Sequence, residues 1–143
     1  MKTKQENFEE KKLEQVYKEI KKPLLEHNID EALNIISAYI KKDINNPHYL
    51  GLRATMYFSQ TKYNLALKDI KKAIELNQNQ SDFYTIRGKI YFHQEKYNNA
   101  LENLLKAKSL KSENAETFYY LGLIYMDQYE YTLAIENFNK AIS

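Results

Sequence analysis

Three segments of this chain spell nearly the same pattern at an interval of 34 residues. They begin at Met56, Ile90 and Ile124 and read MYFSQTKYNLALKDIKKAI, IYFHQEKYNNALENLLKAK and IYMDQYEYTLAIENFNKAI. A fixed period of this length is typical of chains built from stacked copies of one supersecondary unit, each burying its apolar face against its neighbours. The period therefore constrains the architecture, and the contents of one unit constrain the rest.

The units align without gaps when Pro47 is counted as position 1, which gives repeats at 47–80, 81–114 and 115–143. Several positions hold one kind of residue in every repeat: position 8 is small, positions 11 and 17 are tyrosine, and positions 20 and 27 are alanine. The residues are Ala54, Gly88, Gly122, Tyr57, Tyr91, Tyr125, Tyr63, Tyr97, Tyr131, Ala66, Ala100, Ala134, Ala73, Ala107 and Ala141. Two helices approach to about 8 Å only where such small side chains meet.

Each unit contains two apolar stripes at helical spacing, separated by a short polar break that reads QTKYN, QEKYN or QYEYT. Such a break is long enough only for a tight turn between two antiparallel helices. Only three glycines and two prolines interrupt the 143 residues. The sequence therefore predicts an all-α protein made of helical hairpins.

This pattern resembles the tetratricopeptide repeat (TPR) family. The resemblance depends on the 34-residue period, on the small residue three positions before a tyrosine, and on the alanine at position 20 followed four residues later by Ile70, Leu104 or Phe138. It implies a right-handed superhelical stack of antiparallel helix hairpins, an α-solenoid, in a single domain of residues 1–143. It also implies a protein-interaction scaffold or adaptor that binds a peptide or helix of a partner protein on its concave groove.

The first part of the chain follows the pattern only in its second half. Residues 29–46 match a second helix and exit loop, whereas the preceding segment places Pro23 where the repeats have a tyrosine. Because proline lacks an N–H and breaks helix interiors, we expect residues 6–46 to form a degenerate capping unit whose first helix, 8–27, is bent near Pro23. The third repeat stops at Ser143, and we expect it to lack the solvating helix that usually caps such a stack.

Function in such a stack is expected on the concave side. At roughly 100° per residue, positions 2, 5, 9, 12 and 13 of the first helix point away from the partner helix. They give a predicted peptide-binding groove of Thr55, Phe58, Thr85, Lys89, Phe92, His93, Tyr119, Leu123 and Met126, to which the capping unit adds Tyr17, Lys21, Leu24 and Leu25. Two alternatives stay open: that Phe58 and Phe92 pack between neighbouring first helices, and that Lys89 is an ordinary solvated lysine.

A second interpretation is structural. The last predicted helix carries apolar residues on what we expect to be its outer face, namely Leu133, Ile135, Phe138 and Ile142. This face would drive self-association into a homo-oligomer, or docking within a larger assembly. The two interpretations differ in oligomeric state, because a groove binder stays monomeric whereas a self-associating stack gains mass with concentration.

One subtype of the family can be tested against the sequence. Co-chaperones of this family that grip the C-terminal carboxylate of heat-shock chaperones carry Lys and Asn at positions 5 and 9 of one repeat, Asn at position 6 of the next, and Lys and Arg at positions 2 and 6 of the third. The corresponding residues here are Gly51, Thr55, Ile86, Glu116 and Tyr120, or, one unit earlier, Tyr17, Lys21, Leu52, Asp82 and Ile86. Neither set forms this carboxylate clamp, so we predict no binding of such chaperone tails.

Catalysis and metal binding are not predicted. Position 13 reads Ser59, His93 and Asp127 in successive repeats, but a catalytic triad needs contacts of about 3 Å, and equivalent helices lie on the order of 10 Å apart. The histidines, His27, His48 and His93, have no partner at helical spacing for a metal site, and the chain has no cysteine. We therefore expect a protein that is not an enzyme and that uses no cofactor and no metal.

Composition narrows the partners and the compartment. The 21 basic residues nearly balance the 19 acidic ones and form no basic stripe of the kind that nucleic-acid binders show. A third interpretation, reading of single-stranded RNA, needs polar base-reading positions, whereas this groove is largely apolar. No apolar run approaches the roughly 20 residues that cross a bilayer, and the charged N-terminal segment has no apolar signal core. We expect a cytoplasmic protein that recognises another protein, binds no nucleic acid and spans no membrane.

Overall fold

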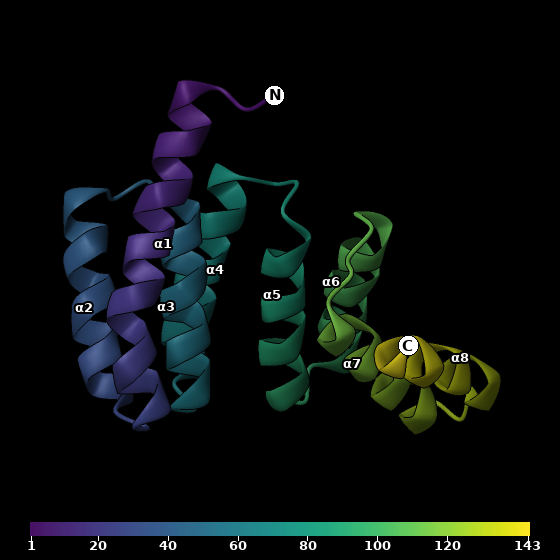
Figure 1. Cartoon of the computed structure of the whole chain (residues 1–143). Helices are drawn as coiled ribbons and strands as arrows, with labels where there is room; N and C mark the ends of the chain where they lie inside the picture. The colour runs from purple at the N-terminus through teal and green to yellow at the C-terminus, as the bar shows by residue number, and fades with distance from the viewer.

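The computed structural model describes all residues, 1–143, as eight α-helices without a β-strand (Figure 1). The helices are α1 (Lys4–Leu25), α2 (Ile29–Lys42), α3 (Pro47–Ser59), α4 (Tyr63–Leu76), α5 (Ser81–His93), α6 (Tyr97–Ser109), α7 (Ala115–Asp127) and α8 (Tyr131–Ile142). Consecutive helices pair as hairpins, α1 with α2, α3 with α4, α5 with α6, and α7 with α8. The all-α fold predicted from the repeat is confirmed. None of the helices combines the length and the apolar content that a bilayer crossing requires.

The hairpins stack side by side into an α-solenoid. The second helix of each hairpin contacts the first helix of the next, α2 with α3, α4 with α5, and α6 with α7. The first helices also contact one another, α3 with α5 and α5 with α7, whereas contacts between the second helices are weaker or absent. The odd-numbered helices therefore line the inner side of the stack, and the even-numbered helices cover its outer side.

Each hairpin turn is closed by a non-glycine residue in the left-handed region, with φ of 55°, 59°, 61° and 64° at His27, Thr61, Glu95 and Tyr129. In the second hairpin the Thr61 N–H donates to the Phe58 carbonyl at 2.9 Å, and the next N–H, of Lys62, donates to the Tyr57 carbonyl at 2.9 Å. This is the Schellman arrangement, which satisfies carbonyl groups left free at a helix C-terminus. Glycine is the usual residue at such a position. Because these turns have none, the polar breaks predicted a turn but not its left-handed backbone.

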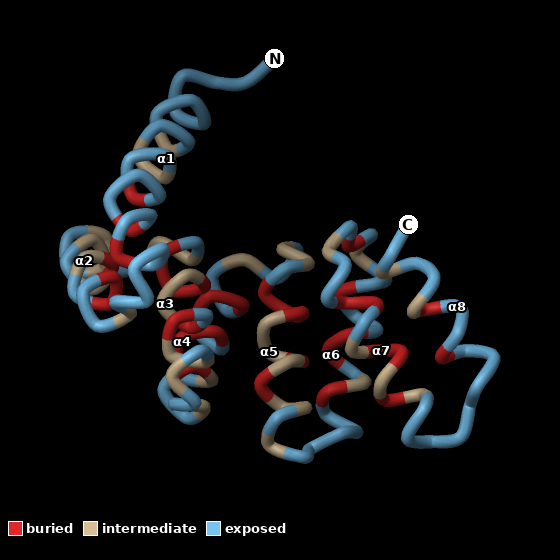
Figure 2. The backbone as a smooth tube through the Cα atoms, turned by 60° about the horizontal axis from the view of Figure 1, so that its bottom comes forward, coloured by how far each residue is buried: buried red, intermediate tan, exposed pale blue.

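Inside each of the three repeats a small residue on the first helix meets a large residue on the second. The pairs are Ala54 with Ile70, Gly88 with Leu104, and Gly122 with Phe138. A Cβ atom added at Gly88 would lie 2.7 Å from Leu104 Cγ, and one added at Gly122 would lie 2.6 Å from the Phe138 ring. The small residue leaves room for its large partner, and this keeps the two helices in close contact along the buried stripes in Figure 2.

In the second hairpin a polar pair also joins the two helices, α3 and α4, near the small–large contact. The guanidinium of Arg53 donates two hydrogen bonds to the carboxylate of Asp69, at 2.7 Å and 2.8 Å. Donating to the Asp69 carboxylate raises the pKa of Arg53 above its ordinary value. At the equivalent positions one repeat later, Arg87 donates to Asn103 at 2.6 Å, whereas in the third repeat Leu121 replaces the arginine. Since Asp69 is buried, its bidentate partner offsets the cost of removing a carboxylate from water.

The first helix differs from the prediction at both ends. It begins at Lys4 rather than at residue 6 or 8, because Thr3 and Glu6 form a capping box. The Glu6 N–H donates to the Thr3 hydroxyl at 3.1 Å, and the Thr3 N–H donates to the Glu6 carboxylate at 2.6 Å. The helix also continues through Pro23 to Leu25, so the proline does not end it at that residue. Pro23 lies in the last turn of the helix, where it removes one backbone hydrogen bond. Only two helical residues follow it, so the ring has little effect on the direction of the helix.

Replacing Gly88 with alanine tests the close approach of α5 and α6. The added methyl group would collide with the branched Cγ of Leu104, a fully buried side chain without room to move away. Overpacking costs about 1–3 kcal/mol, which exceeds the gain of up to about 1 kcal/mol from the higher helix propensity of alanine. We expect urea denaturation to show that Gly88→Ala lowers the free energy of unfolding by about 1–2 kcal/mol.

The steric origin of this loss is checked with Leu104→Ala, alone and in combination. The double variant should be less destabilised than the sum of the two single variants, because the smaller side chain makes room for the methyl group. A Gly88→Ala protein as stable as wild type would show that the contact is looser than the structure indicates.

Candidate functional site

The predicted groove residues all lie on the inner helices α3, α5 and α7 but differ in exposure. The exposed ones are Thr55, His93, Tyr119 and Met126, and the half-buried ones are Phe58, Lys89, Phe92 and Leu123. Thr85 is buried, with 1% of its surface exposed. The inner side is therefore a mixed surface, in which some predicted residues hold the repeats together and others face solvent.

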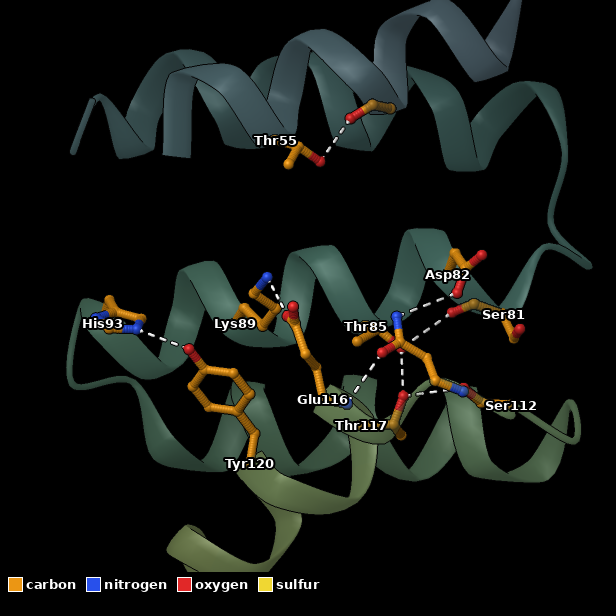
Figure 3. A network of polar contacts seen from close by, with 12 residues as sticks. Thr55, Ser81, Asp82, Thr85, Lys89, His93, Ser112, Glu116, Thr117 and Tyr120 are labelled. Carbon is orange, nitrogen blue, oxygen red and sulfur yellow. Dashed lines mark hydrogen bonds and ion pairs between the residues drawn. The ribbon is translucent and has the colours of Figure 1, made fainter. Parts of the chain in front are cut away.

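Thr85 is a contact between repeats and not part of a groove surface. Its hydroxyl lies 2.7 Å from the hydroxyl of Thr117, which lies 2.9 Å from that of Ser112 (Figure 3). This buried chain joins α5 to α7, and the prediction for Thr85 is wrong. One repeat earlier, Gly51 meets the next inner helix in the same way, since a Cβ atom there would lie 2.9 Å from the ring of Phe83.

Tyr119, at the equivalent position of the third repeat, is exposed. It occupies the position of Gly51 and Thr85 in the third repeat, and no further inner helix packs on α7 to cover it. Its ring lies 5.4 Å from that of Tyr120 and 6.2 Å from that of Phe138. Tyr119 is therefore an exposed aromatic residue of α7, 48% accessible to solvent.

An aromatic cluster around His93 fills the middle of the inner side. The centre of the His93 ring is 5.1 Å from that of Phe58, 5.6 Å from that of Phe92 and 5.9 Å from that of Tyr120. His93 Nε2 shares a hydrogen bond of 3.0 Å with the Tyr120 hydroxyl (Figure 3). Phe58 and Phe92 thus pack between neighbouring inner helices, which was the structural alternative for these two residues.

Lys89 lies beside this aromatic cluster and is held by contacts within the chain. It forms an ion pair with Glu116 on α7 (Figure 3). Its ammonium nitrogen lies 5.0 Å from the centre of the Phe58 ring. Its side chain is only 14% exposed. Lys89 is therefore neither a free hook for a carboxylate nor an ordinary solvated lysine, because its charge is already neutralised by the chain itself.

The cluster changes the acid–base properties of two groups. Desolvation among the surrounding rings lowers the pKa of His93, and the neighbouring charge of Lys89 lowers it further. Desolvation also raises the pKa of the Tyr120 phenol, with an added contribution from the Glu116 carboxylate. At neutral pH both groups are uncharged, so the hydrogen bond between them joins two neutral partners.

An apolar pocket of about 540 Å³ opens between α1 and α3. Its lining is Tyr17, Ile20, Lys21, Leu24, His27, Ile29, Leu52, Thr55, Met56 and Ser59. The sequence predicts Tyr17, Lys21, Leu24 and Thr55 as groove residues, whereas Leu25 does not line the pocket. Ile29, Leu52 and Met56 pack in the apolar core around α1 and α2 and were missed. They border the pocket because Thr55 and Ser59 are small where the next repeat has Lys89 and His93.

A second pocket, of about 350 Å³, lies where α5 meets α7. Its lining is Phe92, Tyr97, Leu123, Met126, Asp127 and Tyr129. The sequence predicts Phe92, Leu123 and Met126 but misses Tyr97 and Tyr129, which flank hairpin turns. The tyrosine at position 17 of every repeat was a signal for Tyr97. Tyr129 could not be found in this way, because its direction depends on the left-handed backbone of its turn.

Ser59, His93 and Asp127 do not come together. The Ser59 hydroxyl donates to the Met56 carbonyl at 2.7 Å, and the His93 ring nitrogen bonds to Tyr120. Asp127 lines the pocket beyond Phe92. These contacts do not make a catalytic triad, in which the base must touch both the nucleophile and the orienting carboxylate.

The end face of α8 is open. Ile135 and Ile142 are 59% and 84% exposed. Their counterparts one and two repeats earlier, Leu101 and Ile74, are half-buried and 8% exposed, because a following hairpin covers them. Leu133 is also exposed. Three of the four predicted self-association residues therefore lie on an accessible face.

Phe138 is the exception. Its ring fills the space left by Gly122 on α7, so it packs inside the last hairpin and is half-buried. The prediction that Phe138 belongs to the outer face is wrong. Position 24 carries the large member of the small–large pair in every repeat, and that packing takes precedence over exposure at the end of the stack.

Stacked helical hairpins with a 34-residue period define a helical repeat protein of the α-solenoid class. Family models match most of the chain: "TPR repeat" matches residues 88–128, "Tetratricopeptide repeat" matches residues 115–143, and "Anaphase-promoting complex, cyclosome, subunit 3" matches residues 26–107. The chain belongs to the tetratricopeptide repeat family. No curated protein sequence matches it.

Solved structures share the fold. MamA superposes with a TM-score of 0.71 at 28% identity, over 85% of this chain and 71% of that one. YrrB, a TPR protein with an unusual peptide-binding site, gives 0.69 at 24% identity, over 75% of this chain and 55% of that one. The first TPR of Spaghetti (RPAP3), bound to the HSP90 peptide SRMEEVD, gives 0.72 at 25% identity, over 79% of this chain and 90% of that one.

Acid is expected to destabilise the fold through His93. Its pKa in the folded chain lies below the ordinary value of 6.5, so the unfolded chain takes up the proton first as the pH falls. The contribution of this group to the free energy of unfolding is constant above pH 6.5 and decreases below it, until the folded-state pKa is passed. Urea denaturation from neutral pH downwards should show a smaller decrease for His93→Gln, which keeps a hydrogen-bonding group near Tyr120. Identical pH profiles would contradict this assignment.

Proposed function

We propose that this chain is a protein-interaction scaffold that binds a peptide or a helix of a partner protein on the inner side of its stack. The observation that carries the proposal is the apolar pocket of about 540 Å³ between α1 and α3. Tyr17 and Leu24 in its wall are 48% and 39% exposed although they are large and mostly apolar. Covering them with a partner side chain removes apolar surface from water, which favours binding.

The scaffold supports this role because its groove is preorganised. The inner helices are fixed by the helix pairs and the contacts between repeats, so binding orders few additional residues and loses little conformational entropy. Lys21, Thr55 and Ser59 place polar groups among the apolar lining, where they can orient a bound peptide. An amphipathic helix or an extended peptide with one large apolar anchor matches this arrangement.

The likeness to the first TPR of Spaghetti (RPAP3) supports peptide binding by the shared fold, since that protein was solved with a peptide. We do not extend the same peptide to this chain. At the clamp positions counted from the first full repeat, Glu116 is an acid where the family has a lysine, and its carboxylate pairs with Lys89. The acidic peptide SRMEEVD is therefore expected not to bind.

A selection of peptides from a random phage-displayed library tests the proposal. We expect wild-type protein to select peptides with a large apolar residue, and Thr55→Arg to weaken their binding at least about tenfold, because the long side chain fills the pocket. The matched control is Thr132→Arg, which changes an exposed threonine at the start of α8, away from the inner side. Calorimetry of one selected peptide with the three proteins gives the comparison. Equal affinity for wild type and Thr55→Arg would show that the pocket is not the binding site.

A second candidate function, self-association or docking in a larger assembly through the end face of α8, is favoured by one observation. Ile135 is 59% exposed, whereas Leu101 at the same position is covered by the next hairpin. If this face pairs with a second copy, sedimentation equilibrium should show a molar mass that rises with concentration, and Ile135→Glu should keep the protein monomeric. Ile135→Glu is preferable to any change at Phe138, because Phe138 supports the last hairpin. A wild-type protein that stays monomeric at all concentrations would exclude the self-association.

A further inference from the structure

The inner side contains two equivalent sites between repeats. Each is formed by the residues at positions 12 and 17 of one repeat and at positions 9, 12, 13 and 15 of the next. The first site consists of Phe58, Tyr63, Lys89, Phe92, His93 and Glu95. The second consists of Phe92, Tyr97, Leu123, Met126, Asp127 and Tyr129, which are the residues that line the pocket of about 350 Å³. Because the backbone repeats, differences between the sites come from the side chains.

The chain itself fills the first site. Phe58 and Tyr63 have ring centres 5.9 Å apart. The ammonium of Lys89 lies 5.0 Å from the centre of the Phe58 ring. The ring of His93 lies 5.1 Å from Phe58 and stacks on Tyr63 at 6.3 Å. The aromatic pair thus holds a cation supplied from the next repeat, as expected from the negative potential of aromatic faces.

The second site keeps the aromatic pair but has no such cation. The rings of Phe92 and Tyr97 are 5.3 Å apart, and Leu123 stands where the first site has its lysine. Asp127 replaces the histidine and takes part in no ion pair or side-chain hydrogen bond. No lysine or arginine of the chain lies over a ring of this site. The result is an open aromatic pocket with an unpaired carboxylate.

We propose that this second site, here named the Asp127 pocket, binds a lysine or arginine side chain of the partner peptide. The aromatic lining attracts the cation, Asp127 supplies the opposite charge, and Leu123 and Met126 cover the methylene stem. The bound side chain takes the role that Lys89 has in the first site. This inference rests on the proposed function, because it assumes a peptide along the inner side, but the chemistry of the pocket can be measured without that peptide.

The lining argues against the other classes of side chain. A carboxylate would meet Asp127 and the negative faces of the rings, and both contacts are repulsive. A purely apolar side chain would cover Asp127 without pairing it, which costs free energy. A cation satisfies both features of the pocket. Since Asp127 is exposed, solvent screens the ion pair and its contribution is modest.

An NMR titration with Nα-acetyl-arginine amide measures the pocket directly. The neutral isostere Nα-acetyl-citrulline amide is the matched ligand control. In wild-type protein the arginine derivative should cause saturable amide shifts at the pocket residues on α7, and the citrulline derivative should cause none there. Asp127→Asn should weaken the arginine binding by about fivefold, the equivalent of ~1 kcal/mol. Glu136→Gln, which removes an exposed carboxylate on α8, should leave it unchanged.

A further variant gives the second site the lysine that the first site has. Leu123→Lys places an ammonium where Lys89 stands one repeat earlier, so it should abolish binding of the arginine derivative while the circular dichroism spectrum stays helical. If arginine and citrulline derivatives shift the same residues equally, or if neither Asp127→Asn nor Leu123→Lys weakens binding, the cation site is overturned.

The peptide selection separates this result from the proposed function. Peptides that depend on the α1–α3 pocket but show no enrichment of basic residues, together with a negative arginine titration, would leave the scaffold function intact and reject the Asp127 pocket. A positive titration without any selected peptide would support the pocket and reject the peptide groove. Selected peptides whose basic residue is enriched on wild type and lost on Asp127→Asn would support both.

Discussion

The close contact between the two helices of a hairpin is the constraint on which the rest of the structure depends. A small residue at position 8 meets a large residue at position 24, as in Gly88 against Leu104 and Gly122 against Phe138. This contact sets the distance and the rotation of one helix relative to the other, because the large residue at position 24 fills the space that a larger side chain at position 8 would need. The rotation in turn decides which residues point to the next repeat and which point to the inner side.

Because every repeat has the same backbone geometry, different side chains at equivalent positions of the inner helices produce different pockets and contacts. Small residues at Thr55 and Ser59 leave an apolar pocket beside α1. At the same positions one repeat later, Lys89 and His93 fill the space with a cation and an imidazole. In the third repeat Asp127 leaves an acidic aromatic pocket. One scaffold thus presents an apolar pocket, a closed contact and an acidic aromatic pocket on its inner side, although the backbone of each repeat is the same.

The sequence predicted the hairpins well because their causes are local. The 34-residue period, the small residues and the polar breaks each act within one unit, and the helices begin at Pro47, Ser81 and Ala115, one period apart. The differences concern the ends of α1 and the cover of side chains, which comes from the same hairpin at Phe138 and from the next repeat at Thr85. Thr85 counted as a groove residue on a helical wheel, but the next inner helix covers it. The helix containing Pro23 continues because the proline lies in its last turn, where a missing N–H removes little.

The sequence by itself determined the class of structure: an all-α stack of hairpins in the tetratricopeptide repeat family, with its inner side on the first helices. That information is carried by periodicity, and periodicity depends on the chemistry of each residue and its neighbours in the chain. The tertiary structure alone decided which inner residues are covered and which line an open pocket. Lys89 and Leu123 occupy the same position of the repeat, yet Lys89 is paired with Glu116 and lies over Phe58, whereas Leu123 lines an open pocket. Pairing and cover come from side chains on neighbouring repeats, and the position of a residue within its own repeat does not specify them.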